Sequence, residues 1–214
     1  KPPRAIESYD ISNWGDGSSV CGMVTFKDGK PFKAGYRKFK MKTVAGTDDY
    51  ASLAETVSRR AAEYEKYAAQ AENGQPSGNW FGQKPDLLLM DGGRGQVSAA
   101  KEALAGTALA DVPLYGMVKD DHHRTRGLYY NNKEIEFPAG TQAFNMITRL
   151  QDEAHRFAIE YHRSLRSKSQ IHSVLDDIEG IGPARRKTLL AYFKDIDGIR
   201  TASLADLEIP SGMT

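Results

Sequence analysis

The sequence has a single cysteine, Cys21, among 214 residues, which excludes a disulfide framework and a cysteine-based zinc finger. It also has no long hydrophobic run. Runs such as Leu87–Met90 have the length of a strand and are far too short to cross a membrane. No basic-then-apolar signal peptide opens the sequence. We therefore expect a cytoplasmic protein with no membrane partner.

Net charge is nearly absent as well, because 29 Lys and Arg stand against 28 Asp and Glu. The balance conceals an uneven distribution: residues 1–42 carry nine basic and four acidic side chains. Within them, the stretch from Lys27 to Lys42 holds seven basic residues and one acid. Two further basic clusters follow, one at Arg156, Arg163, Arg166 and Lys168 and one at Arg185, Arg186 and Lys187. Together they indicate a track for a polyanion, although each alone could be a solvated face.

The rest of the composition, 40% hydrophobic and 27% charged, is typical of a globular protein with one large and one small domain. Periodicity and turn residues predict three strands within residues 4–39 and a helix over 49–71. A buried strand at 86–90, a helix at 96–105, a buried strand at 112–118, a small hairpin and a long helix at 141–165 follow. This order predicts an α/β fold with a mixed five-stranded sheet flanked by helices.

A polar segment then predicts a linker over residues 167–173, between a domain at 1–166 and a small all-α module at 174–214. In this module Gly180 and Gly182 precede a helix that begins near Pro183, a pattern typical of a helix-hairpin-helix element. Glycines that expose backbone N–H groups at a helix start form a phosphate site. Arg185, Arg186 and Lys187 add charge without base readout. Residues 203–213 predict the start of a second hairpin, which is truncated.

Two acids are the strongest candidates for chemistry. Asp91 ends the buried strand and precedes a glycine-rich turn, and ligand sites gather at such strand ends. Asp10 lies in the first strand, where an unpaired carboxylate is costly to bury. If the two strands are neighbours, both acids converge, and two hard oxygen donors suit Mg²⁺ or Mn²⁺. The alternative for Asp91 is a cap of the following helix.

His155 is the third candidate. It lies about 100° from the apolar stripe of the long helix and could point toward a strand end, although a lone helical histidine is commonly a surface residue. The turn Gly92–Gly95 raises a different possibility, a phosphate loop of a nucleotide- or sugar-phosphate enzyme. It lacks both the P-loop ending and the full dinucleotide spacing.

Six motifs together resemble the C-terminal half of the UvrC family of bacterial excinucleases: Glu7–Ser12, Tyr36–Phe39, Asp48–Tyr50, Pro85–Gln96, Asp152–Ala158 and Leu175–Pro183. The resemblance implies an RNase H-like endonuclease domain followed by helix-hairpin-helix elements, and the adjacency of the first and fourth strands. It also implies a catalytic and metal-binding triad of Asp10, Asp91 and His155.

The resemblance further implies the 5′ incision beside a lesion in double-stranded DNA during nucleotide excision repair. UvrB would be a partner through a segment absent from this chain, and we expect a monomer. We expect DNA contacts at Gly180, Gly182, Arg185, Arg186, Lys187, Arg156 and Arg163. The alternative function is a non-catalytic DNA-binding scaffold of the same architecture.

Overall fold

The computed structural model describes residues 2–13, 19–44, 46–73, 79–120, 125–176, 178, 180–194 and 196–210, without the side chains of 161–174 and 176. The chain divides into two compact units, Lys1–Ile159 and Glu160–Thr214. No helix in the described ranges is long and apolar enough to cross a membrane.

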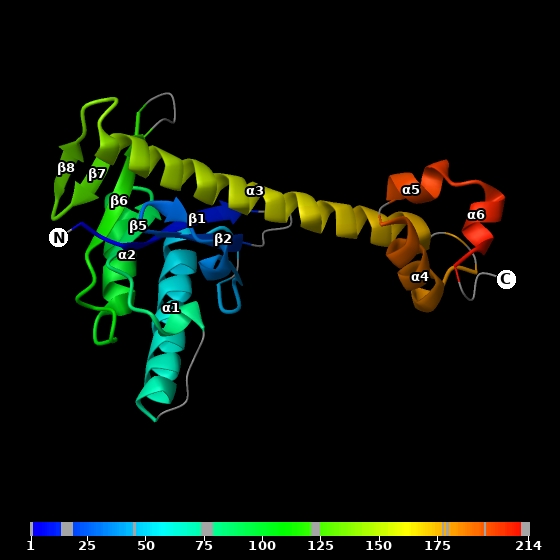
Figure 1. Ribbon diagram of the computed structural model, residues 1–214, viewed down its shortest axis with the longest axis horizontal. Helices are drawn as coiled ribbons and strands as arrows, with labels where there is room; N and C mark the ends of the chain where they lie inside the picture. Colours follow the sequence, from blue (N-terminus) through cyan, green and yellow to red (C-terminus); the bar gives the residue numbers. More distant parts are fainter. Residues whose placement is uncertain are drawn as a thin grey trace. The chain divides into compact units, whose positions relative to one another are not determined.

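A mixed sheet forms the centre of the first unit (Figure 1). The described residues form eight strands: β1 (Ala5–Asn13), β2 (Ser19–Lys27), β3 (Lys30–Pro31), β4 (Arg37–Lys40), β5 (Leu87–Asp91), β6 (Leu114–Lys119), β7 (Thr125–Tyr130) and β8 (Lys133–Glu136). Their order is β3-β2-β1-β5-β6-β7-β8, with β4 also paired to β2. β5 is parallel to both β1 and β6, and the other pairs are antiparallel.

The predicted mixed α/β fold is therefore confirmed, but the sheet has eight strands rather than five. The count of five omitted β3, which has only two residues, and the two strands of the β7–β8 hairpin. Both sit at two-residue turns with positive φ, Asp28–Gly29 and Asn131–Asn132, as tight hairpins of this twist require. The strand predicted from Lys33 is also shorter, because a 3₁₀ turn, η1 (Lys33–Gly35), precedes β4.

Helices cover both faces of the sheet. α1 (Asp49–Glu72) and α2 (Arg94–Leu104) pack on one face, where Tyr9 of β1 and Met90 of β5 join the larger core cluster. α3 (Gln142–Asp176) packs on the other face through its first half (Figure 1). There Ile6 and Leu89 meet Leu150. Successive side chains of a strand point to opposite faces, so each strand serves both cores.

Asp48 caps α1 by accepting a hydrogen bond from the N–H of Ala51, as N-cap residues do. A second 3₁₀ turn, η2 (Trp80–Gly82), precedes β5 and is capped in the same way by Asn79. The two caps fix how the chain enters α1 and, after η2, the central strand β5.

The second unit is helical throughout its described residues. After α3 it contains α4 (Pro183–Phe193), α5 (Ile196–Thr201) and α6 (Leu204–Glu208). The segment 167–173, predicted as a linker, is instead part of α3. It is polar, but it contains no Gly or Pro to stop the helix, so polarity alone was a poor boundary signal. Residues 211–214 of the predicted second hairpin lie outside the described residues.

Candidate active site

The register of β1 against β5 brings Asp10 and Asp91 together. The last paired residues of these parallel strands are Tyr9 and Met90, so each acid is the next residue along its strand. Both side chains are 8% exposed and share the face covered by α3. The expected adjacency of the two strands is confirmed.

The two carboxyl groups influence each other strongly. Burial, the negative charge of Asp91 and a hydrogen bond between the two groups raise the pKa of Asp10 to about 7. His155 opposes this shift only in part. A raised carboxyl pKa of this kind means that the two acids have too little positive charge near them. Such a pair favours the binding of a cation.

His155 lies beside Asp10, with its Nδ1 3.3 Å from Asp10 Oδ2. Its side chain is 63% exposed, so it can contact a ligand from solvent. Gly22, the partner of Asp10 on β2, lies under α3, since a Cβ there would be in ordinary contact with Phe157 at 3.4 Å. The structure thus brings all three predicted site residues to one place.

Two residues that the sequence analysis missed bind Asp91. Lys119 Nζ, at the end of β6, lies 2.8 Å from Asp91 Oδ2. Gln151 Nε2 donates to Asp91 Oδ1 at 2.9 Å, and its own Oε1 accepts a hydrogen bond from the hydroxyl of Thr125. Gln151 is one helical turn before His155, so the two side chains lie on the same side of α3.

A cavity of about 950 Å³ opens beside these side chains. Lys119, Gln151 and His155 line it, together with Arg126, Phe144 and the acids Asp120, Glu136 and Asp152. It therefore combines groups of both charges with aromatic rings, and the acids on its wall are further oxygen donors that suit a cation.

The donor set at this place fits a hard divalent cation in part. Asp10 and Asp91 supply adjacent carboxylate oxygens of the kind that Mg²⁺ and Mn²⁺ prefer. Among the residues that the structure describes, however, no three His, Cys, Asp or Glu side chains form a cluster that could hold a metal ion. In the described arrangement, Lys119 supplies the positive charge at Asp91.

The glycine-rich turn after β5 is explained by packing. Gly92 has a φ of 146°, which favours glycine, and a Cβ there would meet Gln96 at 2.5 Å. A Cβ on Gly95 would meet the Tyr50 ring at 2.5 Å, and one on Gly116 would lie 2.2 Å from the Gly92 carbonyl oxygen. The turn therefore needs small residues in order to fit between α1 and β6, with no phosphate required.

The residues predicted to contact DNA lie in both units. Arg156 pairs with Glu153 at 2.7 Å and remains 46% exposed, whereas the side chain of Arg163 is outside the described residues. In the second unit Gly182 is the N-cap of α4, and Pro183 occupies its first turn, as predicted. Arg185 donates to the carbonyl of Gly180 at 3.1 Å, which ties the basic side chain to the turn.

The basic residues of α4 form a short cluster at its start. Arg185 and Lys187 are exposed and Arg186 is partly exposed. Gly180 has a φ of 88° and is exposed, so the turn before the helix presents backbone to solvent. The cluster provides the cationic surface that the sequence predicts for this segment.

A mixed sheet with helices on both faces and two acids at neighbouring strand ends defines the class of RNase H-like endonuclease domains. Residues 1–159 match the family described as UvrC RNAse H endonuclease domain. The chain belongs to this family, as the resemblance implied.

Curated relatives match nearly the whole chain. The UvrABC system protein C of Lachnospira eligens is 52% identical over 97% of this chain and 33% of its own length. Those of Clostridium acetobutylicum and Clostridioides difficile are 49% and 45% identical over 96% and 100% of this chain. The chain spans about a third of the length of these relatives.

Solved endonuclease structures are more distant. Human ENDOV aligns with a TM-score of 0.44 and 10% identity over 77% of this chain and 86% of its own. Ciona intestinalis Endonuclease V, in complex with a DNA containing an inosine, aligns with a TM-score of 0.35 and 15% identity. That alignment covers 72% of this chain and 56% of the other.

Proposed function

We propose that this chain is a metal-dependent DNA endonuclease that makes the 5′ incision beside a lesion in bacterial nucleotide excision repair. The observation that supports it best is the meeting of Asp10, Asp91 and His155 at one end of the sheet. The names of the relatives, UvrABC system protein C, support the repair role. We also infer a cytoplasmic location, where a bacterial chromosome lies.

Asp10 and Asp91 would hold Mg²⁺ or Mn²⁺, and His155 would complete the site. When bound, the ion supplies Lewis-acid activation of the scissile phosphodiester and helps to activate the attacking water. Gln151 and Lys119 hold the Asp91 carboxylate in place through one oxygen each. The ion would compete with Lys119 for Asp91.

His155 is suited to proton transfer as well as to binding. Its ring is mostly exposed and its Nδ1 faces Asp10, so Nε2 remains available to a substrate or a water. An imidazole nitrogen can accept a proton and an imidazole N–H can donate one, as general acid–base catalysis requires. Asp10 would orient the ring and stabilise its protonated form.

The second unit would hold DNA as a helix-hairpin-helix element. Exposed N–H groups before α4, together with Arg185, Arg186 and Lys187, suit the phosphates of a double strand. Arg156 and Arg163 of α3 would also contact DNA. UvrB would bring the damaged DNA through a segment outside this chain, and the chain would act as a monomer.

Nicking of a supercoiled plasmid by the purified chain, with Mn²⁺ or Mg²⁺ and with a chelator, tests the proposal. We expect metal-dependent nicking that Asp10→Asn and Asp91→Asn abolish while DNA binding persists. Asp111→Asn is the matched control, because Asp111 is an exposed acid paired with Lys84 and should leave nicking unchanged. DNA binding without nicking under any metal condition would instead support a non-catalytic scaffold.

A further inference from the structure

A second cavity, of about 490 Å³, lies at β2, η1 and η2, away from the acids. Six of its lining residues are Lys27, Phe32, Arg37, Asn79, Trp80 and Gln83. None of them contributes to the site at Asp10 and Asp91, and the cavity is not explained by the function proposed above.

The strand register separates this cavity from the catalytic acids. Asp10 pairs with Gly22 of β2, whereas Lys27 pairs with Ala5. Lys27 is five residues farther along β2 than Gly22, which is about 17 Å at strand spacing. Lys27 also has the same strand parity as Cys21, which faces α1 rather than α3. The two sites therefore lie on opposite faces of the sheet.

The wall of the cavity combines positive charge with aromatic rings. Lys27 Nζ lies 5.7 Å from the centre of the Phe32 ring and 5.6 Å from that of Trp80. The Arg37 guanidinium lies 4.6 Å from the centre of the Phe81 ring. Within the described part of the chain, neither Lys27 nor Arg37 forms a salt bridge with a carboxylate, so an incoming anion need not displace one.

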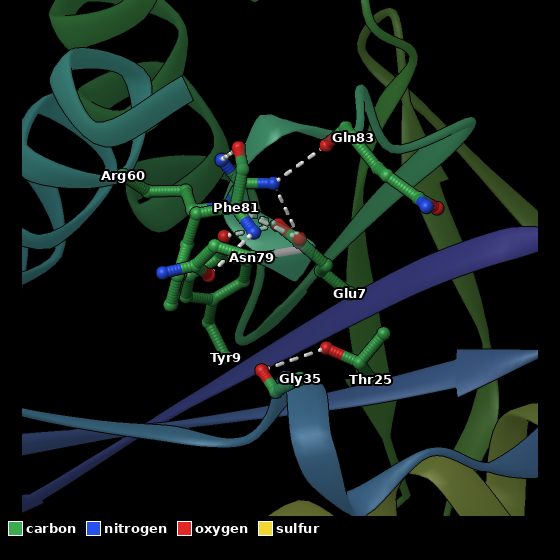
Figure 2. Close-up of polar contacts among 8 residues, drawn as sticks. All are labelled: Glu7, Tyr9, Thr25, Gly35, Arg60, Asn79, Phe81 and Gln83. Atoms are coloured by element: carbon green, nitrogen blue, oxygen red, sulfur yellow. Dashed lines mark hydrogen bonds and ion pairs between the residues drawn. The ribbon is translucent and has the colours of Figure 1, made fainter. Parts of the chain in front are cut away.

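A buried ion pair anchors the 79–83 segment, which contributes to the wall of the cavity (Figure 2). Arg60 Nη2 lies 2.9 Å from Glu7 Oε1, with the two side chains 1% and 0% exposed. The same guanidinium donates to the carbonyls of Phe81 and Gln83, at 3.0 and 2.9 Å. The 79–83 segment is thus fixed from below, and the cavity is preformed.

Trp80 provides a second sign of an unfilled site. Its side chain is almost fully buried, at 7% exposed, yet its indole N–H has no hydrogen-bond partner among the described residues. A buried donor without an acceptor costs about 1–3 kcal/mol. Trp80 itself lines the cavity, but its indole nitrogen is buried, so the ring must shift before this donor can reach a bound acceptor.

We propose that this cavity binds a phosphate of a nucleic-acid strand, with the neighbouring nucleotide against Phe32. An arginine and a lysine match the acceptor oxygens of a phosphate, and the aromatic rings match a base or a sugar. The choice of a strand as ligand rests on the proposed function. The contact would hold DNA on the face of the sheet away from the incision.

The test uses tryptophan emission. The chain has two tryptophans, so Trp14→Phe makes Trp80 the only reporter. An oligothymidylate, thymidine monophosphate, inorganic phosphate and polyglutamate are titrated separately in chelator, so that no cleavage occurs. We expect the oligothymidylate to change the emission at a concentration at least tenfold below either small phosphate.

Lys27→Gln with Arg37→Gln should weaken oligothymidylate binding about tenfold, and should reduce the slope of log K against log salt by about 0.7 for one phosphate that is no longer neutralised. Lys133→Gln, an exposed lysine on β8, is the matched control and should change neither value. Unchanged thermal melting shows that the variants fold.

Three results would overturn the proposal: no change in Trp80 emission, equal affinity of the double variant, or binding of polyglutamate as tight as that of the oligothymidylate. A small phosphate that binds as tightly as the strand would equally exclude the strand as the ligand. The outcome is independent of nicking, because emission is read without metal. A chain that never nicks DNA can still give the Trp80 response, and a nuclease can lack it.

Discussion

Lys119 and Asp91 form an ion pair, with 2.8 Å between Nζ and Oδ2, on the carboxylate that we propose as a metal ligand. The lysine is 35% exposed and the acid 8%, so the ammonium reaches in from the rim of the cavity. A divalent ion at this place would meet a cation already bound to one of its oxygen donors. Occupancy by metal and the Lys119 contact are therefore expected to oppose each other.

Lys119→Gln should accordingly strengthen metal binding. Removing one competing positive charge should increase the affinity for Mn²⁺ about three- to tenfold, which corresponds to about 1 kcal/mol. Calorimetric titration of the metal-free protein measures it. Lys133→Gln, remote on β8, should leave the affinity unchanged, and weaker binding by the Lys119 variant would contradict the competition.

Asp10 should make stability depend on pH in the absence of metal. Its pKa is about 7 in the folded protein against an ordinary 3.8, so the folded state holds a proton that the unfolded chain releases. Stability should therefore fall as pH rises from about 4 to about 7, by roughly 2–4 kcal/mol from this group.

Asp10→Asn should remove this dependence. In urea unfolding with chelator, the free energy of unfolding of the variant should increase relative to that of the wild type as pH rises from 4 to 8. Asp111→Asn should show no such relative increase. Mn²⁺ at pH 8 should then stabilise the wild type more than the variant. A constant difference between Asp10→Asn and wild type across this range would show that the two acids do not interact as described.

The Glu7–Arg60 pair should be the most costly ion pair to break. Arg60→Met leaves the Glu7 carboxylate buried without a counter-charge and frees the carbonyls of Phe81 and Gln83, so we expect a loss of about 3–5 kcal/mol. Lys84→Ala removes an exposed pair with Asp111 and should cost less than about 1 kcal/mol. Urea unfolding of both variants measures the difference, and similar losses would be evidence against the buried pair.

Binding of the second unit to DNA should be strongly dependent on salt and indifferent to sequence. Replacing Arg185, Arg186 and Lys187 with alanine should lower affinity for a duplex and reduce the salt slope by about 0.9 for each phosphate that the variant no longer neutralises. Fluorescence anisotropy over a range of salt concentrations measures both. Arg200→Ala, an exposed arginine of α5, is the control, and an unchanged slope in the triple variant would exclude the α4 cluster as a DNA contact.

The sequence predicted the elements that carry strong local signals. Asp48 is an N-cap, Asp28–Gly29 is a hairpin turn and Leu87–Met90 is a buried strand, because each follows from a short stretch of residues. The segment 167–173, predicted as a linker, is helical instead, because a polar composition is compatible with a helix. Short elements such as β3 and η1 have no periodicity to detect.

The site was predictable as a set of residues but not as a geometry. Asp10 and Asp91 could be selected because a carboxylate in or at the end of a buried strand is costly unless it is paired or binds a ligand. Only the pairing of β1 with β5 brings the two acids together. Lys119 and Gln151 were missed because a lysine at a strand end and a glutamine on a helix are ordinary residues. Their role arises from the distance to Asp91, which no local pattern encodes.

The alternation of side chains along β1 has a consequence for folding. Glu7 points to Arg60 on one face and Asp10 points to His155 on the other, three residues apart on a single strand. A slip of β1 by one residue would turn Glu7 toward the α3 side and Asp10 into the apolar layer under α1. Arg60 would then lose its counter-ion, so the buried pair discriminates against the misaligned strand. The same contact that stabilises the core thereby determines which acid lies beside Asp91 and His155.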